Sequence, residues 1–567
     1  LAVGLWPAAL RNLEQHAVAT RWRSFGALPD ERDGMPAPRL AAERDSAYQN
    51  LCLLESGGQY TLYGNGQVLF VFPDPIGYEH AVHFIMAQQP RAQRVLLLGG
   101  NPVGEPPELL KYPLQRLVCV DLDPAVRDLA RLAEPGRYAE TAADPRTVWV
   151  VEDAVRYVRR TAERFDIAIV NAPDPTTAAA SRFFTREFFA DLRRCLRPGG
   201  FVCTAATSSE RLQREAADMG ATVYATLAAV FPRVLVTAEG RNRFFAGDAD
   251  APLTFDRRAL YERSRAAGVP TQYFRPEYFL GCDEIDPAKV RFVVRRFREA
   301  TAPVSTVLRP AAAFYHLLLW SRFSASGAWQ ADRFARLAAP RWLALGLILA
   351  GALAGAMGRL ARRRQGTWQR ALAAAVIGAT GFCGIGLEIA LIYVYQSLYG
   401  TVYTRVGLLY AAFMLGLVLG APSGGALAGG GARRSRLALA GLELLLLAVA
   451  VGLVPALARA GAAAALGLSD GVVGGVLLAA VVLTGWAVGA EFPLANALYQ
   501  AAGGGTVQGA ALTEAADHGG AALGSALTGV LLLPWWGIGG AALILAALKA
   551  AGLLALAGWR TPDDAAG

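Results

Sequence analysis

The spacing of apolar and polar positions changes at about residue 340 of this 567-residue chain. Before that point, short apolar runs alternate with polar stretches. After it, the chain is rich in Ala, Gly, Leu and Val, and the uncharged runs are long. A bilayer span takes about 20 helical residues, so this part predicts an all-α transmembrane helix bundle of about seven segments, the first of them marginal. The segments are roughly 342–358, 371–396, 404–427, 435–457, 470–497, 518–535 and 537–557.

In the first part, five apolar runs have the length and continuity of buried parallel strands. They are RVLLLGG (94–100), LVCVDLD (117–123), TVWVVEDA (147–154), FDIAIVNAPD (165–174) and GGFVCTAA (199–206). Helix-like stretches separate them, which predicts βαβ units and a doubly wound, Rossmann-like α/β sheet. Further strand candidates lie at 233–239 and 242–247. Residues 48–72 alternate in polarity around Asn65-Gly66, a hairpin signal that predicts a small N-terminal β-subdomain.

These patterns divide the chain into five expected parts. They are a lead-in at 1–45, a β-hairpin subdomain at 46–90, a Rossmann-like nucleoside-binding domain at 91–250, a helical extension at 251–335 and the transmembrane bundle at 340–560. The chain begins with the apolar stretch LAVGLWPAAL and without Met. We therefore expect a fragment or a processed form, with a membrane segment missing ahead of the lead-in.

Composition agrees with this division. Charged residues make up 18% of the chain, against about one quarter in soluble domains. The net charge is +9, and part of the positive charge lies on arginines beside apolar segments, such as Arg359 and Arg362–Arg364. We expect these arginines to set the membrane topology and to contact anionic lipid, and not to bind nucleic acid. The six cysteines form no CxxC pair, so we expect free thiols and neither disulfides nor a metal site.

Candidate chemistry lies at the carboxyl ends of the predicted strands, where open α/β sheets bind ligands. An ordinary strand end or a turn would explain each feature alone, whereas a glycine-rich loop followed by an acid about 20 residues later is typical of a nucleoside site. The features are Gly99-Gly100-Asn101-Pro102-Val103-Gly104, Asp121, Glu152-Asp153-Ala154 and Asn171-Ala172-Pro173-Asp174-Pro175.

In this order and spacing, the motifs resemble the spermidine synthase (polyamine aminopropyltransferase) family over residues 45–250. The resemblance also rests on Ser46–Gln49, LYGNGQVLF (62–70) and LRPGGF (196–201). The chain is more similar still to the membrane-fused bacterial branch of that family. That likeness is carried by SRFFTREFF (181–189), VLRPAAAFYHLLLW (307–320), GLEIALIY (386–393) and FMLGLVLGA (413–421).

The resemblance implies a class I methyltransferase-like fold that binds decarboxylated S-adenosylmethionine and transfers its aminopropyl group to an amine. It implies no permanently bound cofactor and no metal, and it leaves a homodimer open. Gln49 would contact the nucleoside, Asp121 the ribose and Asp153 the adenine, while Asp174 would face the amine. The other substrate-binding candidates are Tyr78, Glu79, His83, Gly99, Gly100 and Gly104.

Two acidic residues that are typical of the family are missing from this chain. Asn101 and Pro102 replace the third Gly and the Asp of the family's loop, and Asn171 stands where the family has its general base. Loss of a general base typically costs about 10²–10⁴-fold in rate. Three hypotheses stay open: a membrane-anchored transferase, a non-catalytic ligand sensor, and a transporter whose soluble domain is structural.

Tyr78 is near the position of the family's amine-placing tyrosine, although another register puts Gly77 there.

Side chains outside these motifs have two interpretations. His83 is either catalytic or a packed histidine. The aromatic residues Phe183, Phe184, Phe188 and Phe189 are expected on one core-packed helix face, and Arg182 either packs with them or reaches the ligand cleft.

In the bundle, charged residues are candidates for a proton or substrate relay, or for hydrogen bonds between helices. They are Glu388, Glu443 and Glu491 within apolar segments, and Asp517 with His518 at the mouth of the sixth segment. We expect a multi-pass protein of the cell (inner) membrane. Arg359–Arg370 and Arg433–Arg436 would be cytoplasmic. If all seven segments span, residues 1–340 then lie on the other face, away from a cytoplasmic substrate. Either the first segment does not span, or the domain has left that substrate.

Overall fold

The computed structural model describes Thr20, Trp22, Leu212 and residues 38–208, 214–300, 302–323, 340–360, 365–400, 403–462 and 470–559. The predictions for Leu1–Leu10 and Arg362–Arg364 lie outside these residues. The chain forms two compact units. The first comprises Leu1–Ala172, Leu192–Ala205 and Phe231–Phe292, and the second comprises Pro173–Asp191, Ala206–Val230 and Val293–Gly567. We describe each unit by itself.

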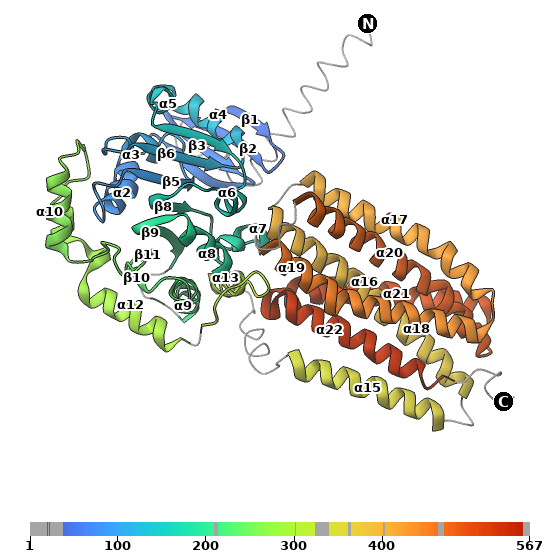
Figure 1. The fold of residues 1–567 in the computed structure, drawn as a ribbon. Helices are drawn as coiled ribbons and strands as arrows, with labels where there is room; N and C mark the ends of the chain where they lie inside the picture. The colour runs from blue at the N-terminus through green and yellow to red at the C-terminus, as the bar shows by residue number, and fades with distance from the viewer. Residues whose placement is uncertain are drawn as a thin grey trace, which may run out of the picture. The chain divides into compact units, whose positions relative to one another are not determined.

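A small antiparallel sheet opens the first unit (Figure 1). Its strands lie in chain order and are β1 (Arg39–Asp45), β2 (Asn50–Ser56), β3 (Gln59–Gly64) and β4 (Gln67–Phe72). The β3–β4 turn uses Asn65 (φ 50°) and Gly66 (φ 80°), the left-handed backbone that a tight hairpin requires. The predicted hairpin and β-subdomain are confirmed.

The larger sheet of this unit has seven strands in the order β10-β11-β9-β8-β5-β6-β7. Four strand pairs are parallel: β5 with β6, β6 with β7, β5 with β8, and β8 with β9. Strand β10 pairs antiparallel with β11. This confirms the predicted doubly wound α/β sheet. The strands are β5 (Arg94–Gly99), β6 (Arg116–Asp121), β7 (Thr147–Val151), β8 (Phe165–Asn171), β9 (Leu196–Thr207, which enters the second unit), β10 (Arg233–Val236) and β11 (Arg241–Gly247).

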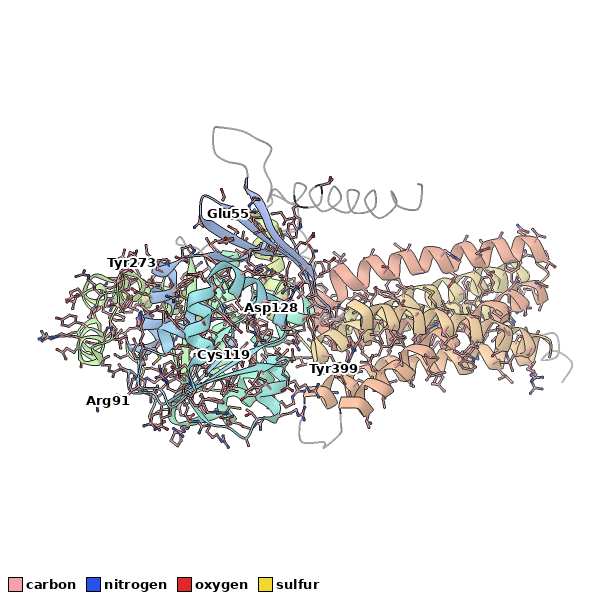
Figure 2. The ribbon with its side chains drawn as sticks, turned by 90° about the horizontal axis from the view of Figure 1, so that it is seen from above. Glu55, Arg91, Cys119, Asp128, Tyr273 and Tyr399 are labelled. Carbon is pink, nitrogen blue, oxygen red and sulfur yellow. The ribbon has the colours of Figure 1, made fainter. Side chains whose placement is uncertain are left out.

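Helices of the first unit connect and cover these strands. The core of the sheet is apolar, with Leu97, Ile167 and Phe245 almost fully buried beside Cys119, which Figure 2 labels. All six cysteines lie in the described part of the chain, where they are buried and form no disulfide. The helices are α2 (Pro75–Met86), α3 (Glu105–Leu109), α4 (Pro124–Ala133), α5 (Pro135–Ala143), α6 (Ala154–Arg160), α10 (Arg257–Ala267), α11 (Tyr278–Gly281) and the 3₁₀ turn η2 (Asp283–Ile285).

The second unit joins short helices to a helical bundle. Phe184, Phe188 and Phe189 are buried as predicted, but Phe183 is only partly buried. The four rings do not share one helix face, because Phe183 and Phe184 lie in η1 and the other two in α8. The guanidinium of Arg182 lies 5.1 Å from the Phe183 ring centroid. The elements before the bundle are α7 (Ala178–Ser181), η1 (Arg182–Phe184), α9 (Arg214–Ala228) and α13 (Ala311–Phe323). Two helices carry residues of both units, α8 (Arg186–Arg194) and α12 (Pro287–Glu299).

Long helices lie side by side in the bundle (Figures 1 and 2). Six runs within the described residues are long and apolar enough to cross a membrane. The sixth, Thr506–Leu556, turns at Gly537 (φ 67°) and so contains two helices. The elements are α15 (Pro340–Leu360), α16 (Gln365–Tyr399), α17 (Tyr403–Ala428), α18 (Ala432–Ala448), the π-turn η4 (Val449–Leu453), α19 (Val454–Ala462), α20 (Asp470–Ala501), α21 (Thr506–Leu527), the π-turn η6 (Thr528–Leu532) and α22 (Leu533–Leu556).

Small residues let these helices approach closely. A Cβ added at Gly420 would lie 2.1 Å from the Trp486 carbonyl oxygen, and one at Gly520 would lie 1.9 Å from the Gly378 carbonyl oxygen. One boundary prediction was wrong. Helix α21 begins at Thr506, so Asp517 and His518 lie inside it and not at its mouth. Its polar first turns lower the local hydropathy, which is why the apolar pattern placed the start too late.

Candidate functional site

The carboxyl ends of four parallel strands meet at one edge of the larger sheet, and the chain order reverses beside β5. Open α/β sheets bind ligands at such a switch point. Gly99 ends β5, Asp121 ends β6, Asp153 follows β7 and Asn171 ends β8. These four predicted residues therefore belong to one candidate site in the first unit.

Two glycines allow the loop after β5 to pass directly against the end of β8. Gly99 (φ 68°) and Gly100 (φ 96°) have left-handed backbone angles. A Cβ added at Gly99 would lie 2.9 Å from the Asn171 carbonyl oxygen, and one at Gly100 would lie 2.5 Å from Asn171 Nδ2. A side chain at either position would collide with the neighbouring strand end, so the loop requires glycine here.

Asn171 has a carboxyl group beside it. Its Nδ2 donates to Glu105 Oε1 (3.3 Å), and Glu105 Oε2 accepts from the Asn101 backbone N–H (2.8 Å). Burial raises the pKa of Glu105 to about 7, although its hydrogen bonds act in the opposite direction. An acid with a pKa near neutral thus stands next to the side-chain amide of Asn171.

Asp121 and its neighbours link the small sheet to the larger one. Asp121 Oδ1 accepts from the Asp123 backbone N–H (3.0 Å), and burial raises the pKa of Asp121 to about 6. Asp123 Oδ1 caps α4 by accepting from the Ala125 N–H (3.1 Å). Asp123 Oδ2 accepts from Ser46 Oγ (2.7 Å) and Gln49 Nε2 (3.1 Å). The predicted nucleoside contact Gln49 is therefore held, through Asp123, close to the predicted ribose contact Asp121.

Asp153 stands at the first turn of α6. Its Oδ1 accepts from the Arg156 N–H (3.0 Å), and the side chain is almost fully buried. Such a helix cap accounts for an Asp at this position without a ligand. Its role toward adenine stays a prediction.

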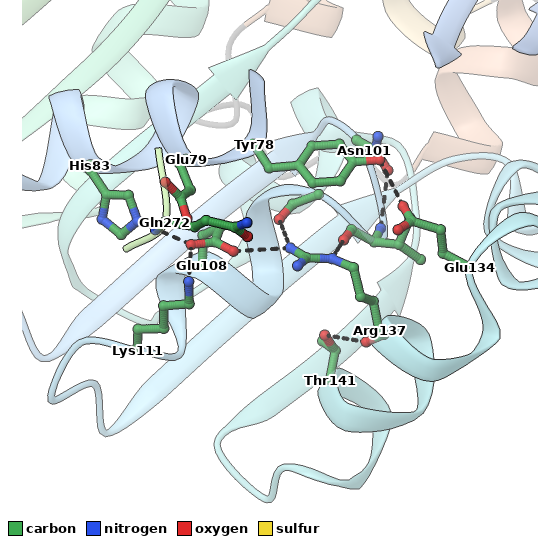
Figure 3. A network of polar contacts seen from close by, with 12 residues as sticks. Tyr78, Glu79, His83, Asn101, Glu108, Lys111, Glu134, Arg137, Thr141 and Gln272 are labelled. Carbon is green, nitrogen blue, oxygen red and sulfur yellow. Dashed lines mark hydrogen bonds and ion pairs between the residues drawn. The ribbon is translucent and has the colours of Figure 1, made fainter. Parts of the chain in front are cut away.

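Arg137, on α5, fastens the glycine-rich loop (Figure 3). Its Nε donates to the Val103 carbonyl (2.9 Å), and its Nη2 donates to the Gly104 carbonyl (3.3 Å) and to Glu108 Oε1 (3.1 Å). Its guanidinium lies 5.0 Å from the Tyr78 ring centroid. A Cβ added at Gly104 would lie 2.7 Å from Tyr78 Cδ1. Tyr78 therefore packs against the loop, and its hydroxyl donates to Glu134 (2.7 Å).

Glu108 gathers the remaining charges of this network (Figure 3). It is 2% exposed and pairs with His83 Nε2 (3.0 Å), Lys111 Nζ (2.6 Å) and Arg137 Nη2 (3.1 Å). Burial acts to raise the pKa of Glu108, but these partners outweigh it and hold the pKa at about 2. His83 Nδ1 contacts the Tyr112 hydroxyl (2.7 Å). Both ring nitrogens of His83 are thus engaged inside a buried network.

Glu79 has its own set of partners. Its carboxylate accepts from the backbone N–H groups of Gln272 (2.8 Å), Tyr273 (2.7 Å) and Phe274 (2.7 Å). These bonds fasten residues 272–274 to α2 and occupy both carboxylate oxygens. The contacts of Glu79 are therefore those of a structural residue.

Asp174 lies in the second unit with a histidine from the chain far downstream. Its Oδ1 accepts from the Thr207 N–H (3.1 Å), and its Oδ2 lies 3.9 Å from His316 Nε2. His316 is 3% exposed. Burial lowers the pKa of His316, and the charge of Asp174 opposes that shift.

The bundle candidates differ in their surroundings. Glu388 is 2% exposed, and its Oε1 has no hydrogen-bond partner among the described residues. A Cβ added at Gly381 would lie 2.8 Å from Asp517 Oδ1, so Asp517 faces α16. Glu491 is fully buried and pairs with Lys549 (3.0 Å).

The sequence analysis missed several residues of these sites, Arg137 and Glu108 among them, and three others show which signals were present. Glu105 directly follows the glycine-rich loop, and Lys549 is the one charge in the apolar segment 537–557. Both positions carried a usable signal. His316 lies in a motif used for the resemblance, but nothing local pairs it with Asp174.

Comparison with known proteins agrees with the predicted resemblance. Residues 76–237 match the family model described as the spermine/spermidine synthase domain. The polyamine aminopropyltransferase of Mycobacterium tuberculosis is 34% identical over 181 residues, which cover 31% of this chain and 34% of the relative. That of Saccharolobus islandicus is 28% identical over 219 residues, covering 37% of this chain and 70% of the relative. This chain thus spans about a third of the length of the first relative.

Two solved structures are also similar. Spermidine synthase from Thermotoga maritima is 22% identical, has a TM-score of 0.38 and covers 46% of this chain and 88% of its own. A spermidine synthase in complex with the transition-state analogue AdoDATO is 22% identical, has a TM-score of 0.39 and covers 46% of this chain and 89% of its own. The predicted resemblance to the spermidine synthase family is confirmed for this domain, while the membrane-fused branch stays a prediction.

Proposed function

We propose that this protein is a multi-pass inner-membrane aminopropyltransferase whose α/β domain binds decarboxylated S-adenosylmethionine at the carboxyl ends of β5 to β8. The main support for this proposal is the close approach of Gly99 and Gly100 to Asn171, whose side chain donates a hydrogen bond to Glu105. It lies at the switch point of the sheet, inside the segment that matches the spermine/spermidine synthase domain.

The nucleoside would lie across this edge of the sheet. Asp121 would accept hydrogen bonds from the ribose hydroxyls, and Gln49, which donates to Asp123, would contact the nucleoside nearby. Asp153 would accept a bond from the adenine amino group. The glycine-rich loop lets the nucleoside approach the backbone, and Arg137 fixes that loop from behind.

The transfer is a displacement at the carbon next to the sulfonium. The ammonium of the acceptor first gives a proton to a base, which frees the lone pair of its nitrogen. That lone pair forms the new C–N bond, the C–S bond breaks, and its electron pair goes to sulfur, which leaves a neutral thioether and a secondary ammonium product. Asn171 cannot take the proton of the acceptor, so we assign it to Glu105, whose pKa near 7 suits a general base at neutral pH. The role of Asp174 toward the cationic acceptor stays a prediction.

The proposal is tested on the full-length protein in detergent. We expect calorimetry to detect binding of decarboxylated S-adenosylmethionine, and Asp121→Ala to abolish it. Asp128→Ala is the matched control, because Asp128 lies on the same α/β domain and is partly exposed in an ion pair with Arg44. Mass spectrometry should then detect the aminopropylated amine together with the thioether product. If neither the substrate nor the thioether binds, the assignment of a nucleoside site is wrong.

A further inference from the structure

Three ionisable side chains from three helices meet inside the bundle. Glu443 on α18, Glu491 on α20 and Lys549 on α22 are each 0% exposed. Lys549 Nζ lies 3.1 Å from Glu443 Oε1, 3.0 Å from Glu491 Oε2 and 2.8 Å from Thr380 Oγ1 on α16. We name these three charged residues the Glu–Lys–Glu cluster.

The charges of the cluster do not balance. With all groups ionised, two carboxylates face one ammonium, which leaves one negative charge. Each of the three N–H groups of Lys549 already has an acceptor, so the ammonium has no further hydrogen bond to donate. Glu443 Oε2 and Glu491 Oε1 are buried and have no hydrogen-bond partner among the described residues. An uncompensated buried charge and an unpaired buried acceptor are both strongly unfavourable.

Among the described residues, no second cation contacts the carboxylates of the cluster. Cys383 on α16 and Asp517 on α21 are close enough to interact with the cluster, and neither carries positive charge. The arginines of the bundle that the structure describes lie in the first or last two turns of their helices. Within the described helices, Lys549 is the one cation in ion-pair contact with either carboxylate.

The helices pack closely around the cluster, so a proton fits as the missing positive charge better than a larger cation does. A Cβ added at Gly552 would lie 2.9 Å from Glu443 Oε2 and 3.1 Å from its carboxyl carbon. The backbone of α22 therefore lies directly against the unpaired oxygen, with little room for a hydrated ion. A proton needs no such room, and one proton neutralises the cluster.

We propose that the Glu–Lys–Glu cluster is a proton-binding site in which Glu443 and Glu491 share one exchangeable proton. Release of that proton leaves a buried net charge among α16, α18, α20 and α22, so protonation favours the closed packing seen here. A bundle built in this way couples proton uptake to the arrangement of its helices, as a proton-driven carrier requires. This inference does not depend on the activity proposed for the α/β domain.

Infrared difference spectroscopy of the purified full-length protein, exchanged between H₂O and D₂O, counts protonated carboxyl groups. We expect one from the cluster in the wild type. Glu443→Gln and Glu491→Gln should each remove it entirely, because one remaining carboxylate balances Lys549. Lys549→Gln should raise the count to two. Glu388→Gln shows how much Glu388 itself contributes to the infrared signal of protonated carboxyl groups. Glu514→Gln, at an exposed position of α21, should leave that signal unchanged.

The two single glutamine variants decide the matter. If both keep the wild-type signal, the proton is not shared in this cluster and the proposal is overturned. Both variants should fold, since each leaves a neutral pair, and a melting curve checks this. Should either be unstable, the wild type remains decisive. Burial raises the pKa of Glu105 and Glu239 to about 7 and that of Asp121 to about 6, so these acids of the α/β domain also contribute below neutral pH. No protonated carboxyl beyond theirs and that of Glu388 would also overturn the proposal.

Discussion

Replacing Glu105 by glutamine should remove the proton acceptor of the transfer step while keeping the size of the side chain. Loss of a general base lowers the rate by about 10²–10⁴-fold, and the decrease should fall on kcat because Glu105 is not expected to bind the nucleoside. The variant also loses one acceptor, since Asn171 Nδ2 and the Asn101 N–H now share a single oxygen. That loss should destabilise the fold by about 1–3 kcal/mol.

A second substitution separates the chemical role of Glu105 from its structural one. In Glu105→Gln combined with Asn171→Asp, a carboxylate stands at the position where the resemblance implies a base. We expect this double variant to recover most of kcat, although it restores neither the wild-type loop contacts nor its charge distribution. Glu140→Gln on α5, where the side chain is exposed, serves as the control and should leave kcat unchanged.

The pH profile gives an independent test of the same assignment. Burial holds the pKa of Glu105 at about 7, so wild-type kcat should rise with pH through about 7 as the base loses its proton. With the same amine, the profile of the double variant should lie at lower pH. If Glu105→Gln keeps the wild-type kcat, or if its profile is unchanged, Glu105 is not the base.

Three further substitutions test the surrounding structure. Glu108→Gln should lower the free energy of unfolding by on the order of 3 kcal/mol near neutral pH. Since the folded-state pKa of Glu108 is depressed to about 2, this difference should disappear as pH falls from about 4.5 toward 2 in chemical denaturation; a difference that does not change with pH would contradict the assignment. Gly100→Ala should abolish nucleoside binding measured by calorimetry, because its Cβ would lie 2.5 Å from Asn171 Nδ2 at φ 96°, and wild-type affinity would show that the loop has room. Asp123→Ala should cost about 1 kcal/mol through the lost cap of α4 and weaken nucleoside binding through Gln49; an unchanged dissociation constant would separate Gln49 from the site.

The strand ends could be predicted from the sequence because parallel strands share a direction. Once 94–100, 117–123 and 165–174 are recognised as parallel strands, their carboxyl ends must lie at one edge of the sheet, and Asp121 and Asn171 come with them. No three-dimensional information beyond the chain order is needed for that step. The same holds for the hairpin at Asn65-Gly66, where the turn requires left-handed backbone.

Contacts that depend on a side chain's direction could not be predicted in this way. Glu105 reaches Asn171 only because two positive φ angles bend the loop against β8. Arg137 comes from α5 and reaches back more than 30 residues to the carbonyls of Val103 and Gly104. Neither the strand pattern nor the helix pattern contains the rotation that brings these groups together.

The bundle shows how far charge counting alone can go. Segments of the bundle contain Glu388, Glu443 and Glu491, and one lysine, Lys549. Because a lone charge in hydrocarbon must find a partner, counting predicts that Lys549 pairs with one of these acids, but it does not predict which. The structure adds that Lys549 pairs with two of them and that Glu388 lies apart from this pairing. The second carboxylate makes the cluster more than a neutral bridge between helices, since two buried acids on one lysine require a further positive charge whenever the bundle is closed.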